Sequence, residues 1–103
     1  MKYFRADRFR ADYARLSDHE RQLFSNAVRT INAAYGDAEG RWPPVWPASL
    51  RVKTVTSAPG VWEVTWSFAG PDGRATFEYV TVDEEPAIRW LRIGGHEIFR
   101  EPR

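Results

Sequence analysis

Apolar residues in the first third of the chain recur at helical spacing. Phe9, Tyr13 and Leu16 follow one another at intervals of four and three residues, which predicts a helix that begins at Asp7. We expect the Asp7 side chain to cap the first turn of this helix. A second apolar stripe predicts a longer helix, and its members are Leu23, Phe24, Ala27, Val28, Ile31, Ala34 and Tyr35.

The junction between the two helices carries the clearest local signal. Ser17 precedes Glu20 by three residues, which is the spacing of a capping box. Gly36 follows the second apolar stripe and is expected to be the C-cap of that helix. Because hardly any residues separate the two helices, we expect them to form an αα-hairpin.

From Leu50 onward the apolar pattern changes to a period of two, which is typical of strands. Alternation is seen over residues 50–54, 62–68 and 75–79, residues 87–93 form the last full strand, and turn residues stand at 57–60, 70–73 and 83–86. The strand over 87–93 has apolar residues on both faces, so it is expected to be central in the sheet. We expect the helices to pack on the face formed by Trp62, Val64, Trp66 and Phe68.

These elements predict an α+β fold. The 103 residues fit one domain, spanning 1–103. Its first part is a short N-terminal strand at Tyr3–Arg5 and the αα-hairpin, packed on a C-terminal antiparallel β-meander of three to four strands. Residues 96–99 form a short segment after the last strand.

Composition narrows the classes of function. The chain has no Cys and only 2 His, so neither a thiolate site nor a multi-His zinc site is expected, and we expect no cofactor. No apolar run approaches the ~20 residues that cross a bilayer, and the N-terminus has no signal-peptide core, so we expect a cytoplasmic protein without membrane contacts. The net charge of +1 excludes bulk attraction to polyanions, so any such site must be local.

Charged residues collect on the polar positions of the predicted strands: Arg51, Lys53, Glu63, Arg74, Glu78, Arg89 and Arg92. Residues on one face of adjacent strands lie about 5 Å apart, so several of these side chains are expected to converge. Alternating Arg and Glu is also the ordinary pattern of a solvated face with cross-strand ion pairs. Both interpretations stay open for each residue.

A second candidate lies at the end of the last strand. Gly94 and Gly95 allow a sharp turn or a close approach to a ligand, and His96 directly after them is expected to be displayed. Histidine suits general acid–base catalysis near neutral pH. The alternative is a surface loop with an incidental histidine. His19, inside the capping box, is assigned a structural or incidental role.

The available side chains limit the chemistry of a catalytic site. The sequence has no phosphate-binding glycine loop, no dinucleotide fingerprint, no nucleophile elbow and no metal-ligand spacing. An enzyme built from Arg, Lys, Glu and His, with no cofactor, suits cleavage of RNA by its own 2′-hydroxyl group. A base removes the 2′ proton, a cation stabilises the phosphorane, and an acid protonates the leaving oxygen.

The order of strand, two helices and antiparallel meander resembles the RelE/ParE superfamily of type II toxins. Three stretches carry the likeness: residues 3–7 opening into a helix, the hairpin of residues 62–66 and 74–79 with an Arg after its turn, and residues 93–99. Members of that superfamily cleave messenger RNA on the ribosome or poison DNA gyrase, and a partner antitoxin neutralises them. The resemblance therefore implies a ribosome-dependent endoribonuclease whose partners are an antitoxin, the ribosome and mRNA.

By position, the resemblance implies roles for individual residues. Arg74 would stabilise the phosphate charge, His96 would be a general acid or base, and Glu63 and Glu78 are candidate bases. The substrate-binding residues would be Arg51, Lys53, Arg92 and Phe99. Two alternatives stay open: a ParE-like toxin that binds DNA gyrase, and a non-catalytic protein-interaction domain. The nearly neutral charge and the absence of a hydroxyl on Phe99 depart from the pattern of RNA-cleaving members.

Overall fold

The computed structural model describes residues 1–66 and 72–103. Its helices are α1 (Asp7–Ala14) and α2 (Asp18–Asp37), with two 3₁₀ helices, η1 (Ala48–Leu50) and η2 (His96–Arg100). Its strands are β1 (Tyr3–Arg5), β2 (Lys53–Thr54), β3 (Trp62–Trp66), β4 (Gly73–Val82) and β5 (Glu85–Gly94). Within these residues, no helix is long and apolar enough to cross a membrane.

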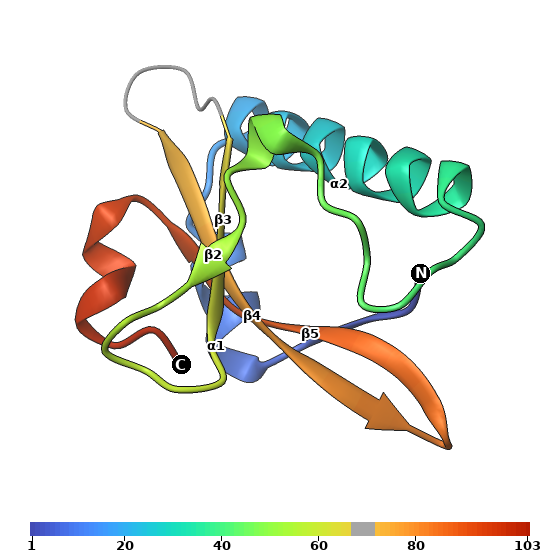
Figure 1. Ribbon diagram of the computed structural model, residues 1–103. Helices are drawn as coiled ribbons and strands as arrows, with labels where there is room; N and C mark the ends of the chain where they lie inside the picture. Colours follow the sequence, from blue (N-terminus) through green and yellow to red (C-terminus); the bar gives the residue numbers. More distant parts are fainter. Residues whose placement is uncertain (67–71) are drawn as a thin grey trace.

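The five strands form one sheet in the order β1-β5-β4-β3-β2 (Figure 1). Strands β2 to β5 are an antiparallel meander, and β1 pairs in parallel with β5 at the far edge. The α+β fold and the four-stranded meander predicted from the sequence are confirmed. Strand β5 lies between β1 and β4, which confirms its predicted central place.

The αα-hairpin is present, but two of its helix caps differ from the prediction. The capping box is present: the Glu20 amide donates to Ser17 Oγ at 3.1 Å, and the Ser17 amide donates to Glu20 Oε1 at 2.8 Å. The predicted Asp7 cap is wrong, because Ala6 holds the N-cap position of α1 and Asp7 lies in the first turn. The predicted C-cap at Gly36 is also wrong, since α2 continues through Asp37.

Two of the predicted strand and turn boundaries also change. Leu50 belongs to η1, and Arg51 has a φ of 47°, so the chain becomes extended only at Lys53. The turn predicted at 83–86 is shorter, because Val82 already pairs with Glu85. Only residues 83 and 84 form it, both with positive φ. Phe68 and the turn residues at 70 and 71 lie outside the described residues.

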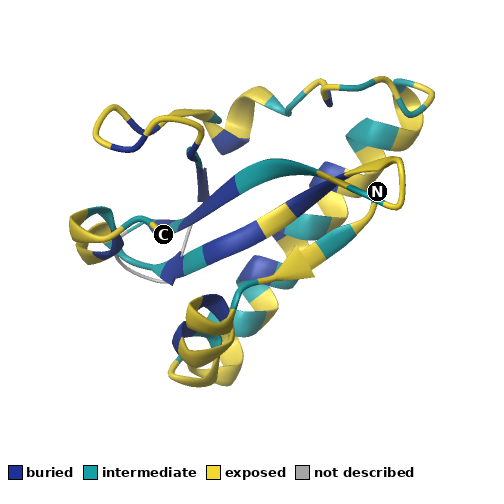
Figure 2. Cartoon of the chain, turned by 90° about the horizontal axis from the view of Figure 1, so that it is seen from below, coloured by how far each residue is buried: buried dark blue, intermediate teal, exposed yellow. Residues whose placement is uncertain are grey.

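The core lies between α2 and one face of the sheet. Phe24, Ala27 and Ile31 of α2 belong to one buried cluster with the sheet residues Val64, Trp66, Ala75, Phe77, Ile88, Trp90 and Ile93. Figure 2 shows this pattern as buried segments along the central strands and alternating exposure along the helices. The predicted packing of the helices on the tryptophan face of β3 is confirmed for its described members.

A β-bulge in β5 changes which of its side chains point to each face of the sheet. Phe77 pairs with Trp90 and Thr76 pairs with Arg92, so Leu91 is the extra residue. The bulge shifts the alternation by one position. Ile93 therefore rejoins the core cluster on the α2 side, whereas Leu91 packs in a second cluster with Val55, Ala58 and Val61.

Candidate functional site

The sheet face opposite α2 carries polar side chains in two adjacent rows. Thr65, Arg74 and Gly94 pair across β3, β4 and β5 in one row. Glu63, Thr76 and Arg92 pair in the next row, and Glu78 lies opposite Arg89 beyond it. We call this surface the polar face. The chain after β5 returns over it, first as η2 and then as residues Glu101–Arg103, which we call the tail.

Arg74 lies at the η2 end of the polar face. Its Nη1 donates to Thr65 Oγ1 at 3.0 Å, and its Cζ lies 5.7 Å from the centre of the Phe99 ring. The buried Arg74 Nε makes no hydrogen bond to the described residues, and none of their carboxylate oxygens lies within 4.0 Å of this guanidinium. Arg74 is thus held in place without being neutralised.

Phe99 of η2 contacts Arg74, and His96 lies on the other side of this contact, against Phe99. The exposed His96 ring lies 5.3 Å from the Phe99 ring at 77°, so Phe99 contacts both His96 and Arg74. The chain bends at Gly95, between β5 and η2, as expected, although neither Gly94 nor Gly95 has a positive φ. A Cβ on Gly95 would lie 2.6 Å from Oε2 of Glu97, which is the end of an exposed side chain and can move aside. Glu97 Oε1 accepts from the Gly95 amide at 3.0 Å.

Glu63 lies diagonally across from Arg74 on the same face, a separation of about 7–8 Å between backbones. It is only 7% exposed, and Lys53 Nζ lies 3.6 Å from its Oε1. The structure thus brings these two predicted residues together beside the Arg74 row. Glu63 is a carboxylate shielded from water, with one cation beside it.

Two further predicted residues are engaged elsewhere. Glu78 lies between Arg89 at 3.3 Å and Arg103 at 3.4 Å. Arg51 donates to Asp72 at 2.8 Å. This hydrogen bond is the main cause that lowers the pKa of Asp72, with smaller help from the charges of Arg51 and Arg74. Neither Glu78 nor Arg51 lies in the Arg74 row.

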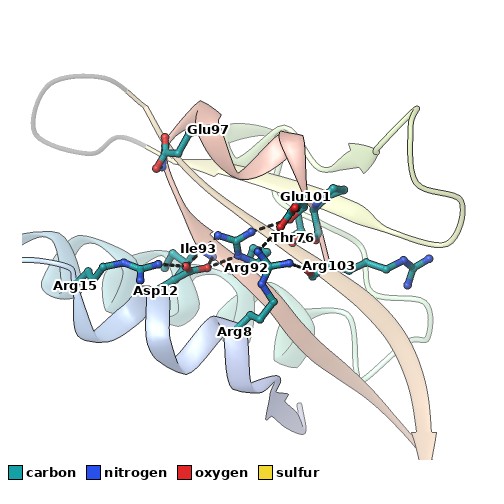
Figure 3. Close-up of polar contacts among 11 residues, drawn as sticks. Arg8, Asp12, Arg15, Thr76, Arg92, Ile93, Glu97, Glu101 and Arg103 are labelled. Atoms are coloured by element: carbon teal, nitrogen blue, oxygen red, sulfur yellow. Dashed lines mark hydrogen bonds and ion pairs between the residues drawn. The ribbon is translucent and has the colours of Figure 1, made fainter.

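Arg92 is part of a buried network with Asp12 of α1 (Figure 3). Its Nε and Nη2 donate to Asp12 at 2.6 and 3.1 Å, and Arg15 and the Ile93 amide donate to the same carboxylate. Asp12 is 5% exposed. Burial alone would raise the pKa of Asp12, but the hydrogen bonds from Arg92 and Ile93 and the two arginine charges outweigh it and lower the pKa.

The tail covers the Arg92 end of the polar face through its backbone carbonyls. Arg92 Nη1 donates to the carbonyl of Glu101 at 2.8 Å, Thr76 Oγ1 to that of Pro102 at 2.6 Å, and Arg8 Nη1 to that of Arg103 at 2.7 Å. Arg8 also forms an ion pair with the Glu101 carboxylate at 2.7 Å (Figure 3). Donors on this half of the face are therefore already used within the molecule.

Sequence patterns missed three parts of this arrangement: Asp12, Thr65 with Thr76, and the tail. Asp12 did leave a signal. It stands three residues after Phe9 and four before Leu16, so it falls on the apolar stripe of α1, where a charge requires a partner. The threonines look like ordinary strand residues, and nothing in the sequence around Pro102 indicates that its carbonyl meets the sheet.

A hollow of about 450 Å³ opens beside the Gly94–Gly95 backbone. It carries both signs of charge, and its ionisable lining residues are Asp12, Arg15, Glu20, Asp72, Arg92 and Glu97. Among residues 1–66 and 72–103, no three His, Asp or Glu side chains gather as a metal-ion site would require. The chemistry available is therefore that of Arg74, His96 and Phe99 at the η2 end, with Glu63 in the adjacent row.

Comparisons with known proteins give a likeness of fold. No family model and no curated protein matches the chain. A solved structure, the YoeB/ParE toxin from Agrobacterium tumefaciens, superposes with a TM-score of 0.52 at 15% identity, covering 93% of this chain and 99% of the other. The chain therefore has the fold of a YoeB/ParE toxin, as the resemblance in its sequence implied.

Proposed function

We propose that this chain is the toxin of a toxin–antitoxin pair and acts as an endoribonuclease that cleaves mRNA on the ribosome. The observation that carries the proposal is the state of Arg74: a guanidinium held by Thr65 and Phe99 with no carboxylate within ion-pair distance among the described residues. The toxin fold supports the same assignment. An antitoxin is then the expected partner.

The proposed reaction assigns one role to each side chain at the η2 end and one to Glu63 in the adjacent row. Glu63 accepts the proton of the RNA 2′-hydroxyl, whose oxygen attacks the adjacent phosphorus. Arg74 donates to the phosphorane oxygens as their negative charge grows, and His96 protonates the 5′ oxygen as the P–O bond breaks. Phe99 offers a ring on which a base can stack. The products are a 2′,3′-cyclic phosphate and a 5′-hydroxyl.

The test is induced expression without an antitoxin, followed by mapping of RNA ends. We expect the unmodified chain to stop growth and to produce new 5′-hydroxyl ends in translated messages. Removing one positioned donor from a developing oxyanion costs about 10²–10³ in kcat, so Arg74→Ala is expected to abolish both effects, as is His96→Ala. Arg89→Gln, which changes an exposed arginine on the neighbouring strand, is the matched control.

A second candidate is a toxin that binds a protein target such as DNA gyrase. The net charge of +1, and the pairing of Arg51, Lys53, Arg89 and Arg92 with carboxylates, favour it over broad RNA binding. Growth arrest with intact messages and a loss of supercoiling would support this candidate against cleavage. Normal growth with every variant would leave the third hypothesis, a protein-interaction domain that is not toxic.

A further inference from the structure

The buried ion pair between α1 and β5 lies outside the site that carries the proposed chemistry, yet it is connected to it. Asp12 and Arg92 are 80 residues apart in the chain and form a two-bond pair at 2.6 and 3.1 Å. The Arg92 side chain is only 12% exposed. Its third donor, Nη1, binds the carbonyl of Glu101 directly after η2. One guanidinium thus joins α1, β5 and the end of η2.

Helix η2 has few ties of its own. It is five residues long, and the backbone bonds at its two ends are Ile98 to Gly95 at 3.4 Å and Glu101 to Ile98 at 3.2 Å. Ile98 is its buried residue, while His96 is exposed and Phe99 is half-buried. A 3₁₀ helix of this length has poor hydrogen-bond geometry and depends on outside anchors. The anchor nearest its C-terminus is the Arg92–Glu101 bond, and the bonds of Thr76 to Pro102 and of Arg8 to Arg103 hold the tail beyond it.

We infer that Asp12 and Arg92 are positioning residues, which hold η2 so that Phe99 stays against Arg74 and His96 stays beside Phe99. Asp12 fixes the plane of the Arg92 guanidinium by taking two of its donors, which aims the third at the Glu101 carbonyl. Neither residue touches the phosphate in this scheme. Arg92, which the resemblance implies as a substrate-binding residue, here acts by holding η2 instead.

The inference rests on the proposed function only for its effect on catalysis, and its structural part can be tested separately. Arg92→Lys keeps the charge, but a compact ammonium cannot hold both Asp12 oxygens and the carbonyl at once. We expect NMR contacts between the Phe99 ring and the Arg74 side chain to be lost. Exchange of the Glu101 amide should rise at least tenfold, while the amides of β3 and β4 keep their protection.

Arg89→Lys is the matched control, because it makes the same substitution on the same strand in an exposed pair with Glu78. It should leave the Phe99–Arg74 contacts intact. Asp12→Glu is the second variant, since it retains the charge of the pair but moves the carboxylate by one methylene. It too should weaken the Phe99–Arg74 contacts in a folded protein. Contacts that survive in both Arg92→Lys and Asp12→Glu would overturn the inference.

Cleavage assays separate this inference from the proposed function. If the unmodified chain cleaves mRNA, Arg92→Lys should lower kcat at least tenfold and leave KM within about twofold, because substrate still meets Arg74. Equal kcat for Arg92→Lys and Arg89→Lys would overturn the positioning role. If the unmodified chain does not cleave at all while Arg92→Lys still releases η2, the proposed function fails and the positioning role stands.

Discussion

Arg74 and Arg92 lie on the same sheet face in adjacent rows, but their surroundings differ. At the Arg92 end, every donor group of the guanidinium is used, by a buried carboxylate and by the tail. At the Arg74 end, the guanidinium has a hydroxyl and an aromatic ring as neighbours, and its Nε has no hydrogen-bond partner among residues 1–66 and 72–103. A cation that is fully paired stabilises the fold, whereas one that is held but not neutralised remains available to an anionic ligand.

The largest expected effect is the difference in the free energy of unfolding between Arg92→Ala and Arg74→Ala. Arg92→Ala leaves Asp12 buried beside only Arg15, and breaking a buried pair in this way costs about 3–5 kcal/mol. Arg74→Ala leaves no carboxylate unpaired and should cost about 1 kcal/mol or less. Urea unfolding of both variants at neutral pH measures the difference. Similar losses for the two would remove the distinction between the two ends.

Acid should weaken the Arg92 end in particular. The folded-state pKa of Asp12 is lowered, so its contribution to stability is present above the unfolded value of about 3.9 and is lost as pH falls through the folded value. We expect the free energy of unfolding to fall between about pH 5 and pH 2, and to fall less in Asp12→Asn. Asp72→Asn, at an exposed pair, is the comparison; an equal change there would argue against a special role for Asp12.

The ring contact at the Arg74 end should have a smaller effect on stability. Phe99→Leu keeps an apolar side chain but removes the π face, and cation–π contacts at open sites contribute about 0.5–1 kcal/mol. A double-mutant cycle of Phe99→Leu with Arg74→Gln isolates this coupling from the loss of packing. A coupling of zero would mean that Phe99 does not hold the guanidinium.

The smallest expected effect belongs to the exposed pair between Arg89 and Glu78. Its nitrogen and oxygen are 3.3 Å apart at the surface of β4 and β5. Arg89→Gln should lower the free energy of unfolding by about 0.2–1 kcal/mol, and the loss should shrink as the salt concentration is raised from about 0.05 M to about 1 M. A larger loss of stability that does not depend on the salt concentration would show that Arg89 behaves like the buried Arg92 and not like an exposed cation.

Local sequence predicted the parts of the fold that local chemistry controls. The capping box at Ser17 and Glu20, the stripe of α2 and the alternation of β3 and β4 were all recognisable because each depends on neighbours a few residues away. The C-cap of α2 was placed two residues early, at Gly36 and not Ala38, and β2 began three residues later than Leu50. Helix and strand ends depend on tertiary packing as well as propensity.

The candidate site divides in the same way. Arg74 and His96 are candidates from the sequence because Arg74 follows a turn and His96 follows the end of the last strand. The state of each cation was not predictable, because an ion pair such as Arg92 with Asp12 joins positions 80 residues apart. Residue type gives the charge of a side chain, but only its neighbours decide whether that charge is already neutralised.

The sequence by itself determined the two helices, the antiparallel meander and the residue types at the end of the last strand. The tertiary structure decided that β1 joins β5 in parallel, that Asp12 is buried against Arg92, and that the tail lies over Thr76. The physical reason is the separation along the chain over which each interaction acts. Backbone propensity and capping act within a few residues, whereas burial and charge neutralisation act between surfaces that meet only when the chain has folded.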